Sequence, residues 1–477
     1  MQVDPYALRR RRTRAVLISS LCCAALLFGC TATSDAPRAP SATGTSSPSG
    51  EAVNEASLPA APPVPRGAVA ADVENAIKRI VPSLQADALD TGALDSIAAS
   101  GDARLAWMLS DIMRFSSGTD HAALGRAFTE LTGATLGGND DVWRQSTDLL
   151  IYWDTPAPAN YRRFKSGLFL ALEPRWNKIF NDPNADIDWR FLSWGGVLPD
   201  DRKLGDLSRC IRGCIPALDD PPLTSATTGN WYPDDRFVFG VTVNGEHVAF
   251  PKNIMEVHEM VNLTIGNRRI AMPYCTLCGS AQAFFTDRVP GAARPLVLRT
   301  SGLLSLSNKV MYDLETGSAF DTFRGRAVSG PLHDAVVTLP MLTTVVSRWG
   351  DWRRAHPDTR IVGQSGGVGE DYPLDPLQGR DDSGPIFPIR RSDTRLGVHT
   401  QVLGVVAPDG TSIGFPVEAA RTAIEAGKIV RAHGVTLTTD GGGLRATADG
   451  SDVPSHQAFW FAWAQFHPGT ELWTAPG

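Results

Sequence analysis

The His-Glu-x-x-His motif of the zinc metalloproteases is missing from this sequence, so that reaction class loses its usual sequence support. Charge is also scarce, with 20% charged residues and a formal net charge of -6. Because nucleic-acid binding requires a clustered basic surface, we expect no nucleic-acid partner.

The apolar stretch at residues 15–28 is too short to cross a membrane as a helix, which requires roughly 18 or more apolar residues. It follows a run of arginines at residues 9–12 and ends just before Cys30. This order is typical of an export signal. Segment 1–30 resembles a lipoprotein signal, in which Cys30 becomes the acylated first residue of the mature chain. Cleavage without lipidation is the alternative.

Residues 31–65 consist almost entirely of Thr, Ser, Ala, Pro and Gly. Such a segment cannot bury enough apolar surface to offset the entropy of ordering it. As a flexible tether of about 35 residues, it would extend on the order of 30 Å. We therefore expect a lipoprotein in the cell envelope, facing the periplasm or exterior, with the membrane as its partner through the lipid.

Cysteine is rare, with seven residues in the chain. Three lie within the signal or directly after it. The other four form two close pairs, Cys210 with Cys214 and Cys275 with Cys278. An oxidising envelope permits disulfides, but close pairs also occur in metal sites, and the cysteine count alone does not distinguish the two.

The spacing of apolar residues predicts an α+β protein. Between residues 66 and 205 they recur at intervals of three and four, as at Leu105, Leu109 and Ile112, which is the period of an amphipathic helix. Gly133 is placed to end one of these helices. The short successive helices loosely resemble HEAT-type pairs, a layer that usually scaffolds or contacts a partner.

Residues 206–477 change to short β-rich runs separated by Gly, Pro and Asp. Asn244-Gly245 predicts a tight hairpin turn. Two stretches, about 237–362 and 400–473, also share a pattern that indicates an internal duplication. Trp352, His356 and Thr359 recur with identical spacing as Trp463, His467 and Thr470. The Cys275 pair belongs only to the longer copy, so the shared scaffold does not require it.

The candidate site is Cys275-x-x-Cys278-Gly279. An alternating pattern follows it instead of a helix, which favours a turn between strands of the kind that directs two thiolates at one ion. His258 is the first candidate for a further ligand, with Glu259 and the pair Cys210 and Cys214 as others. Zinc or copper would suit such a set. Redox-active thiols and a purely structural pair are the alternatives, and for Cys210 and Cys214 a structural disulfide is favoured.

Several stretches resemble the bacterial family known as Domain of Unknown Function 3179. They are residues 213–221, 250–259, 274–279, 311–316, 352–359 and 459–470. The family usually has Pro where this chain has Thr276 and Asn-Asp where it has Asn262-Leu263, and neither change removes a potential ligand. The resemblance spans about residues 210–473. It implies an envelope-associated bacterial protein and no assigned activity.

Three functions are therefore open for this chain. The first is an envelope lipoprotein that binds a metal ion through Cys275 and Cys278, with help from His258. The second is a non-enzymatic scaffold that binds another envelope protein and uses its cysteines structurally. The third is an envelope thiol oxidoreductase.

Overall fold

The computed structural model describes residues 58–137, 141–206, 208, 210, 213–379, 385–390 and 392–475. The predicted export signal, Cys30 and most of the predicted tether lie outside these residues. Within the described part of the chain, no helix has the length and apolar character needed to cross a bilayer.

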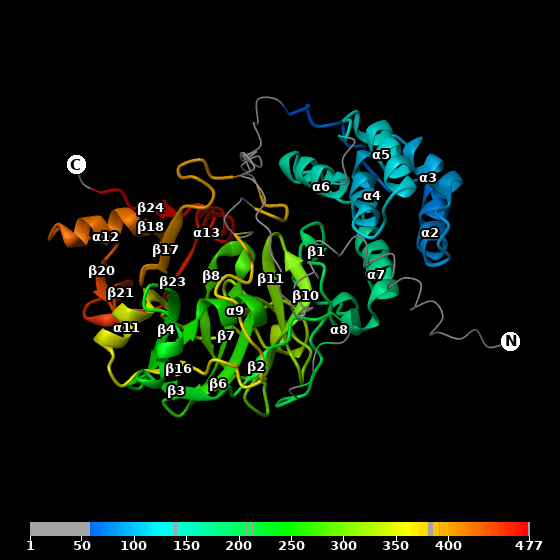
Figure 1. Ribbon diagram of the computed structural model, residues 1–477. Helices are drawn as coiled ribbons and strands as arrows, with labels where there is room; N and C mark the ends of the chain where they lie inside the picture. The colour runs from blue at the N-terminus through cyan, green and yellow to red at the C-terminus, as the bar shows by residue number, and fades with distance from the viewer. Residues whose placement is uncertain are drawn as a thin grey trace, which may run out of the picture.

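The amino-terminal part of the structure is helical, as predicted (Figure 1). Its helices are α2 (Ala71–Gln85), α3 (Thr91–Ala98), α4 (Ala106–Met113), α5 (Thr119–Thr132), α6 (Val142–Tyr152), α7 (Tyr161–Leu172) and α8 (Asn177–Phe180). Local signals set several of their ends. The Asp90 carboxylate accepts a hydrogen bond from the backbone N–H of Ala93 and caps α3. Gly133, with φ of 74°, ends α5 in the left-handed conformation that glycine adopts without strain.

The rest of the chain forms a β-rich domain of five sheets, arranged as a five-blade propeller. The sheet beside the helices contains, in order, β1 (Leu192–Trp194), β10 (Leu298–Ser305), β11 (Asn308–Asp313), β12 (Ala319–Asp321) and β13 (Arg326–Ala327). The next contains β14 (Met341–Leu342), β9 (Ala283–Phe285), β7 (Arg268–Cys275), β6 (Met260–Ile265) and β2 (Leu218–Asp219), with β8 (Ser280–Ala281) paired to β7. The predicted α+β class is thus confirmed.

Two further sheets share one strand order. The first contains β15 (Val345–Arg348), β4 (Phe237–Val243), β5 (Glu246–Pro251), β16 (Arg360–Val362) and β3 (Leu223–Ser225). The second contains β23 (Ser455–Phe459), β17 (Gln401–Val406), β18 (Ser412–Pro416) and β24 (Glu471–Leu472). In each, two antiparallel pairings are followed by one parallel pairing. The predicted hairpin turn at Asn244-Gly245 joins β4 to β5, and both residues have positive φ.

The resemblance between these two sheets extends to side chains. A short helix, α11 (Trp349–Ala355) or α13 (Trp460–Phe466), precedes the parallel strand in each. The Trp352 indole donates to Thr359 Oγ1 at 2.9 Å, and the Trp463 indole donates to Thr470 Oγ1 at 2.8 Å. The fifth sheet, β19 (Arg431–Ala432), β20 (Val435–Asp440), β21 (Gly443–Ala448) and β22 (Ser451–Val453), lies beside them (Figure 1).

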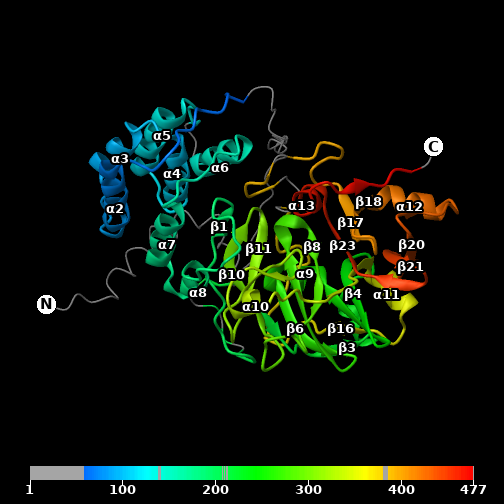
Figure 2. The same ribbon diagram turned by 180° about the vertical axis from the view of Figure 1, so that it is seen from behind.

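The helical part and the β-rich domain share one of the molecule's hydrophobic clusters, and four more lie within the β-rich domain. Buried residues from α2 to α13 belong to a single cluster that also contains Cys275 and Cys278. Hydrogen bonds cross the same boundary, from the Trp176 indole to the Ser301 carbonyl and from Arg114 to the Trp194 carbonyl, each at 2.8 Å. The helices lie at one end of the molecule, and the sheet of β17 and β18 lies at the other (Figures 1 and 2).

Candidate functional site

Cys275 and Cys278 lie at a turn between strands, as the sequence indicates. Cys275 ends β7, and Cys278 ends a single 3-10 turn, Thr276–Cys278. Gly279 follows with φ of 56°, and a Cβ atom there would lie 2.8 Å from the Phe459 ring. Two constraints therefore require glycine at position 279: the positive φ of the backbone and the close approach of the Phe459 ring. No long helix begins here whose dipole could act on the thiols.

The two thiols are buried, free and directed at the same atom. Cys275 is 2% exposed and Cys278 is fully buried. Their sulfur atoms lie 3.7 and 3.6 Å from the carbonyl oxygen of Ser307, in the two-residue turn between β10 and β11. The Ser307 hydroxyl, 3.6 Å from the Cys278 sulfur, also accepts a hydrogen bond from the Gln465 amide at 3.1 Å. Segments far apart in sequence therefore converge on the thiol pair.

The surroundings give the two thiols different acidities. Burial raises the pKa of Cys275, but the hydrogen bond from Cys278, together with the backbone and ammonium of Lys309, outweighs it, so the net pKa is lowered. Burial and the neighbouring Cys275 raise the pKa of Cys278 well above its ordinary value. The pair therefore loses its first proton from Cys275, and Cys278 remains the hydrogen-bond donor.

Glu259 and Lys309 form an ion pair beside the thiols. Glu259 follows helix α9 (Lys252–His258) with φ of 52°. The Lys309 ammonium donates to the Glu259 backbone carbonyl at 2.6 Å and lies 3.2 Å from its carboxylate. The Thr276 hydroxyl donates to the other carboxylate oxygen at 3.2 Å. The Glu259 carboxylate is thus held by two donors and is not free to move toward a metal ion.

His258 is bound elsewhere. Its Nδ1–H donates to the Pro216 carbonyl and its Nε2 accepts from the Tyr372 hydroxyl, both at 2.6 Å. Burial lowers the pKa of His258 to about 4, so the ring is neutral at pH 7. The structure does not bring His258 together with Cys275 and Cys278. The left-handed backbone at Glu259 reverses the chain between α9 and β6, which separates the two neighbouring side chains.

Cys210 and Cys214 are joined by a disulfide. Among the described residues, Asp200, Cys210 and Cys214 make up the one group of three or more His, Cys, Asp or Glu ligand atoms that all lie within 4.8 Å of one another. Sulfur atoms bonded to each other are not thiolate ligands. As a disulfide, Cys210 and Cys214 supply no ligands to a metal ion. Neither this pair nor Glu259 completes a three-ligand set with Cys275 and Cys278.

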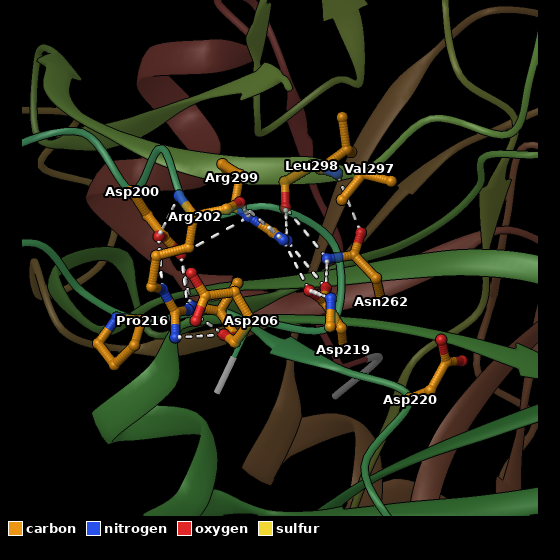
Figure 3. Close-up of polar contacts among 12 residues, drawn as sticks. Asp200, Arg202, Asp206, Pro216, Asp219, Asp220, Asn262, Val297, Leu298 and Arg299 are labelled. Carbon is orange, nitrogen blue, oxygen red and sulfur yellow. Dashed lines mark hydrogen bonds and ion pairs between the residues drawn. The ribbon is translucent and has the colours of Figure 1, made fainter. Parts of the chain in front are cut away.

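Figure 3 shows a buried network of charges that includes Asp200. The Asp200 carboxylate lies 3.8 Å from the Cys214 sulfur of the disulfide. Arg299 forms a bidentate pair with Asp219 at 2.8 and 2.6 Å, and Arg202 forms one with Asp200 at 2.7 and 2.9 Å. The side chains of Asp200 and Arg299 are fully buried. Asn262 donates to Asp219 at 3.0 Å and exchanges two hydrogen bonds with the backbone of Leu298. With two cations and two anions, the network is neutral.

Sequence reasoning missed these charged residues as well as Ser307, Lys309 and Gln465. One signal was available for the network, because Asp200-x-Arg202 belongs to a recurring acid-x-Arg pattern. At Asp102, Glu173, Asp188, Asp200 and Asp393, the arginine two residues later donates its Nε–H to the acid. The residues around the thiols carry no comparable local pattern.

Part of this chain is similar to a known protein family. Residues 212–444, just under half of the chain, match the model of the family described as "Protein of unknown function (DUF3179)". No curated protein and no solved structure matches. The match includes Cys275, Cys278, His258 and Glu259 and ends before β23. This stretch of the chain is therefore similar to the DUF3179 family.

Proposed function

We propose that this protein is an envelope lipoprotein whose Cys275 and Cys278 bind one soft transition-metal ion, with copper(I) as the best fit. The observation that carries the proposal is the convergence of two free, buried sulfur atoms on the Ser307 carbonyl. The other cysteine pair, Cys210 and Cys214, is a disulfide. If Cys275 and Cys278 had only a structural role, we would expect them to form a disulfide as well. Their free thiols instead suit a bound ion.

The ligand count favours copper(I) over zinc. Structural zinc sites are almost always tetrahedral with four protein ligands. Here no third His, Cys, Asp or Glu within the described residues joins the two sulfur atoms at ligand distance, and His258 and Glu259 are occupied by other partners. Thiolates are soft ligands that select copper(I), an ion that two thiolates alone can hold. This proposal therefore does not include His258 as a metal ligand.

Metal analysis of the full-length protein tests the site. After anaerobic incubation with copper(I) and removal of excess ion, we expect about one equivalent bound through the thiol pair. Cys275→Ser and Cys278→Ser should each abolish binding, while the double variant Cys210→Ser/Cys214→Ser should retain it. Less than about a tenth of an equivalent bound, with all four cysteines oxidised, would contradict the proposal and favour a scaffold with structural cysteines.

A thiol oxidoreductase is the second candidate, because the opposite pKa shifts of Cys275 and Cys278 resemble those of a redox pair. The burial of both sulfur atoms counts against a protein disulfide as its substrate. Equilibration with glutathione buffers separates the two candidates. Reversible oxidation of Cys275 and Cys278 to a disulfide, without copper binding, would favour the oxidoreductase.

We propose further that Cys30 carries the lipid that tethers this domain to the membrane. The support is the basic and apolar order of residues 1–30 and the Ser/Thr/Ala/Pro/Gly-rich stretch after it. Cys30→Ser should move the protein from the membrane fraction to the soluble fraction of the envelope. An unchanged distribution would contradict lipidation at this position.

We also infer that the two sheets with matching strand order arose by duplication. The supporting details are the equal register, Val345 opposite Gly240 and His456 opposite Gly404, and the two Trp–Thr hydrogen bonds. The thiol pair lies in the longer insertion of the first copy. The HEAT-like character of the helices, with a protein partner in the envelope, remains a prediction, and co-purification of envelope proteins with the full-length chain tests it.

A further inference from the structure

Several buried polar side chains next to the thiol pair have no hydrogen-bond partner among the described residues. Four of them come from β8 and β23 and the residues beside them: Ser280 Oγ, both amide atoms of Gln282, Ser455 Oγ and Gln457 Nε2. We call Ser280, Gln282, Ser455 and Gln457 the polar layer. Three are fully buried and Gln457 is 6% exposed.

The polar layer adjoins the thiol pair. Ser280 is paired directly with Cys275 across β7 and β8, so their side chains share one face of the sheet with Cβ atoms about 5 Å apart. Strand β8 lies against β23, which supplies Ser455 and Gln457 from alternate positions and hence from one face. Asn308, next to Ser307 in sequence, and Gln465, which donates to Ser307, also have a side-chain oxygen without a partner among the described residues.

Unpaired polar atoms at this density require an occupant. A buried amide or hydroxyl without a hydrogen bond costs about 1–3 kcal/mol, and native proteins satisfy the great majority of such groups with protein or ordered water. The polar layer offers donors, acceptors and hydroxyls, and none of its side chains carries a formal charge. The occupant must therefore be small, neutral and able both to donate and to accept.

We infer that the polar layer holds ordered water molecules, so that the thiol pair is hydrated although both cysteines are buried. The role of this water in metal binding rests on the proposed function. When two thiols bind copper(I), two S–H bonds break, two S–Cu bonds form and two protons leave. Water held beside Ser280, which is paired with Cys275, can accept those protons. The hydration itself does not depend on the metal.

Alkylation of the native full-length protein by iodoacetamide, a small neutral reagent, tests the inference. We expect Gln282→Leu to slow alkylation of the thiol pair by about tenfold, because a leucine removes the donors and acceptors that hold the water, and to leave thermal stability unchanged or lower. Thr300→Val is the matched control, since Thr300 Oγ1 is also buried without a partner, on β10. It should leave the alkylation rate at the wild-type value.

Two results would overturn the inference. One is a Gln282→Leu variant that reacts at the wild-type rate and melts at a higher temperature, the behaviour of a dry, unpaired amide. The other is a native wild-type protein that does not react while the urea-unfolded protein is fully alkylated. Copper binding is measured separately. A protein that binds no copper but reacts more slowly after Gln282→Leu would refute the metal proposal and support the hydrated layer.

Discussion

Arg299 is a fully buried cation that depends on carboxylates for its stability. Its guanidinium meets Asp219 through two hydrogen bonds and lies 3.7 Å from Asp200. Such a pair adds little net stability compared with an apolar core, but removing one partner leaves a buried charge without compensation. The network therefore makes β2, β10 and the segment after β1 mutually dependent.

Arg299→Met is expected to reduce the free energy of unfolding by about 3–5 kcal/mol, because Asp219 would remain buried without its cation. Urea unfolding followed by tryptophan fluorescence measures the loss. Arg326→Met is the control, since the Arg326–Asp186 pair is exposed and should change stability by less than about 1 kcal/mol. Equal effects of the two substitutions would contradict the role of the network.

The pKa of His258 predicts a loss of stability in acid. Its folded-state pKa of about 4 lies below the ordinary 6.5, so the unfolded chain binds the proton more tightly. The stabilisation is complete above pH 6.5 and is lost as pH falls toward 4. The difference is worth about 3 kcal/mol.

Urea unfolding of the wild type and His258→Asn across this pH window measures the effect. The variant should lack the part of the pH dependence that His258 contributes, although His456 and His467, whose pKa values burial also lowers, will keep a slope of the same sign. His433 is a control of opposite sign, since hydrogen bonds to Glu471 and Asp409 raise its pKa. Parallel curves for wild type and His258→Asn would refute the assignment.

At the residue scale, sequence could identify which side chains carry chemistry but not which of them meet. Cys275 and Cys278 were recognisable because their spacing is local. His258 and Glu259 are neighbours in sequence, yet the left-handed backbone at Glu259 places one against Tyr372 and the other against Lys309. Ser307 reaches the thiols only through the packing of β11 near β7, which no local pattern encodes.

At the scale of elements, two glycines permit the packing of tryptophans on matching strands. A Cβ atom on Gly240 would lie 2.4 Å from Trp352, and one on Gly404 would lie 2.1 Å from Trp463. The structure gives both glycines a physical reason, because each glycine leaves the space that an indole ring fills.

Gly404→Ala is expected to destabilise the protein by about 2 kcal/mol or more, because the added methyl group overlaps the Trp463 ring. Gly167→Ala is the matched control. Gly167 lies inside α7 with nothing within 4 Å of the added carbon, so stability should be unchanged or rise by up to about 1 kcal/mol. Thermal unfolding compares the two, and a Gly404→Ala variant as stable as the wild type would contradict the packing argument.

Helices and hairpins were predictable where the signal was local, as at Gly133 and Asn244-Gly245. The pairing of β16 and β24 as parallel strands was not, because each joins its sheet only after a helix and a crossover. The propeller arrangement of the five sheets likewise depends on contacts between distant segments. The alternation of apolar and polar residues predicts where strands form, but it does not predict their order within a sheet.

At the scale of the whole molecule, one hydrophobic cluster crosses the predicted boundary near residue 206. One buried cluster runs from α2 to α13, and Trp176 and Arg114 donate across the boundary. We therefore expect the full chain to unfold in a single calorimetric transition, with calorimetric and van't Hoff enthalpies that agree. Two resolved transitions, one for the helices and one for the sheets, would contradict a shared core.

The position of β23 and α13 sets an order of events during biosynthesis. Phe459 lies against Gly279, and Gln465 donates to Ser307, so residues from the last part of the chain cover the thiol pair. A polypeptide that emerges from its amino terminus presents Cys275 and Cys278 long before those residues arrive. An ion or oxidant therefore reaches the sulfur atoms more easily in that interval than after β23 and α13 have covered them. The compartment in which the chain completes folding thus influences the chemical state in which the closed protein first holds the pair.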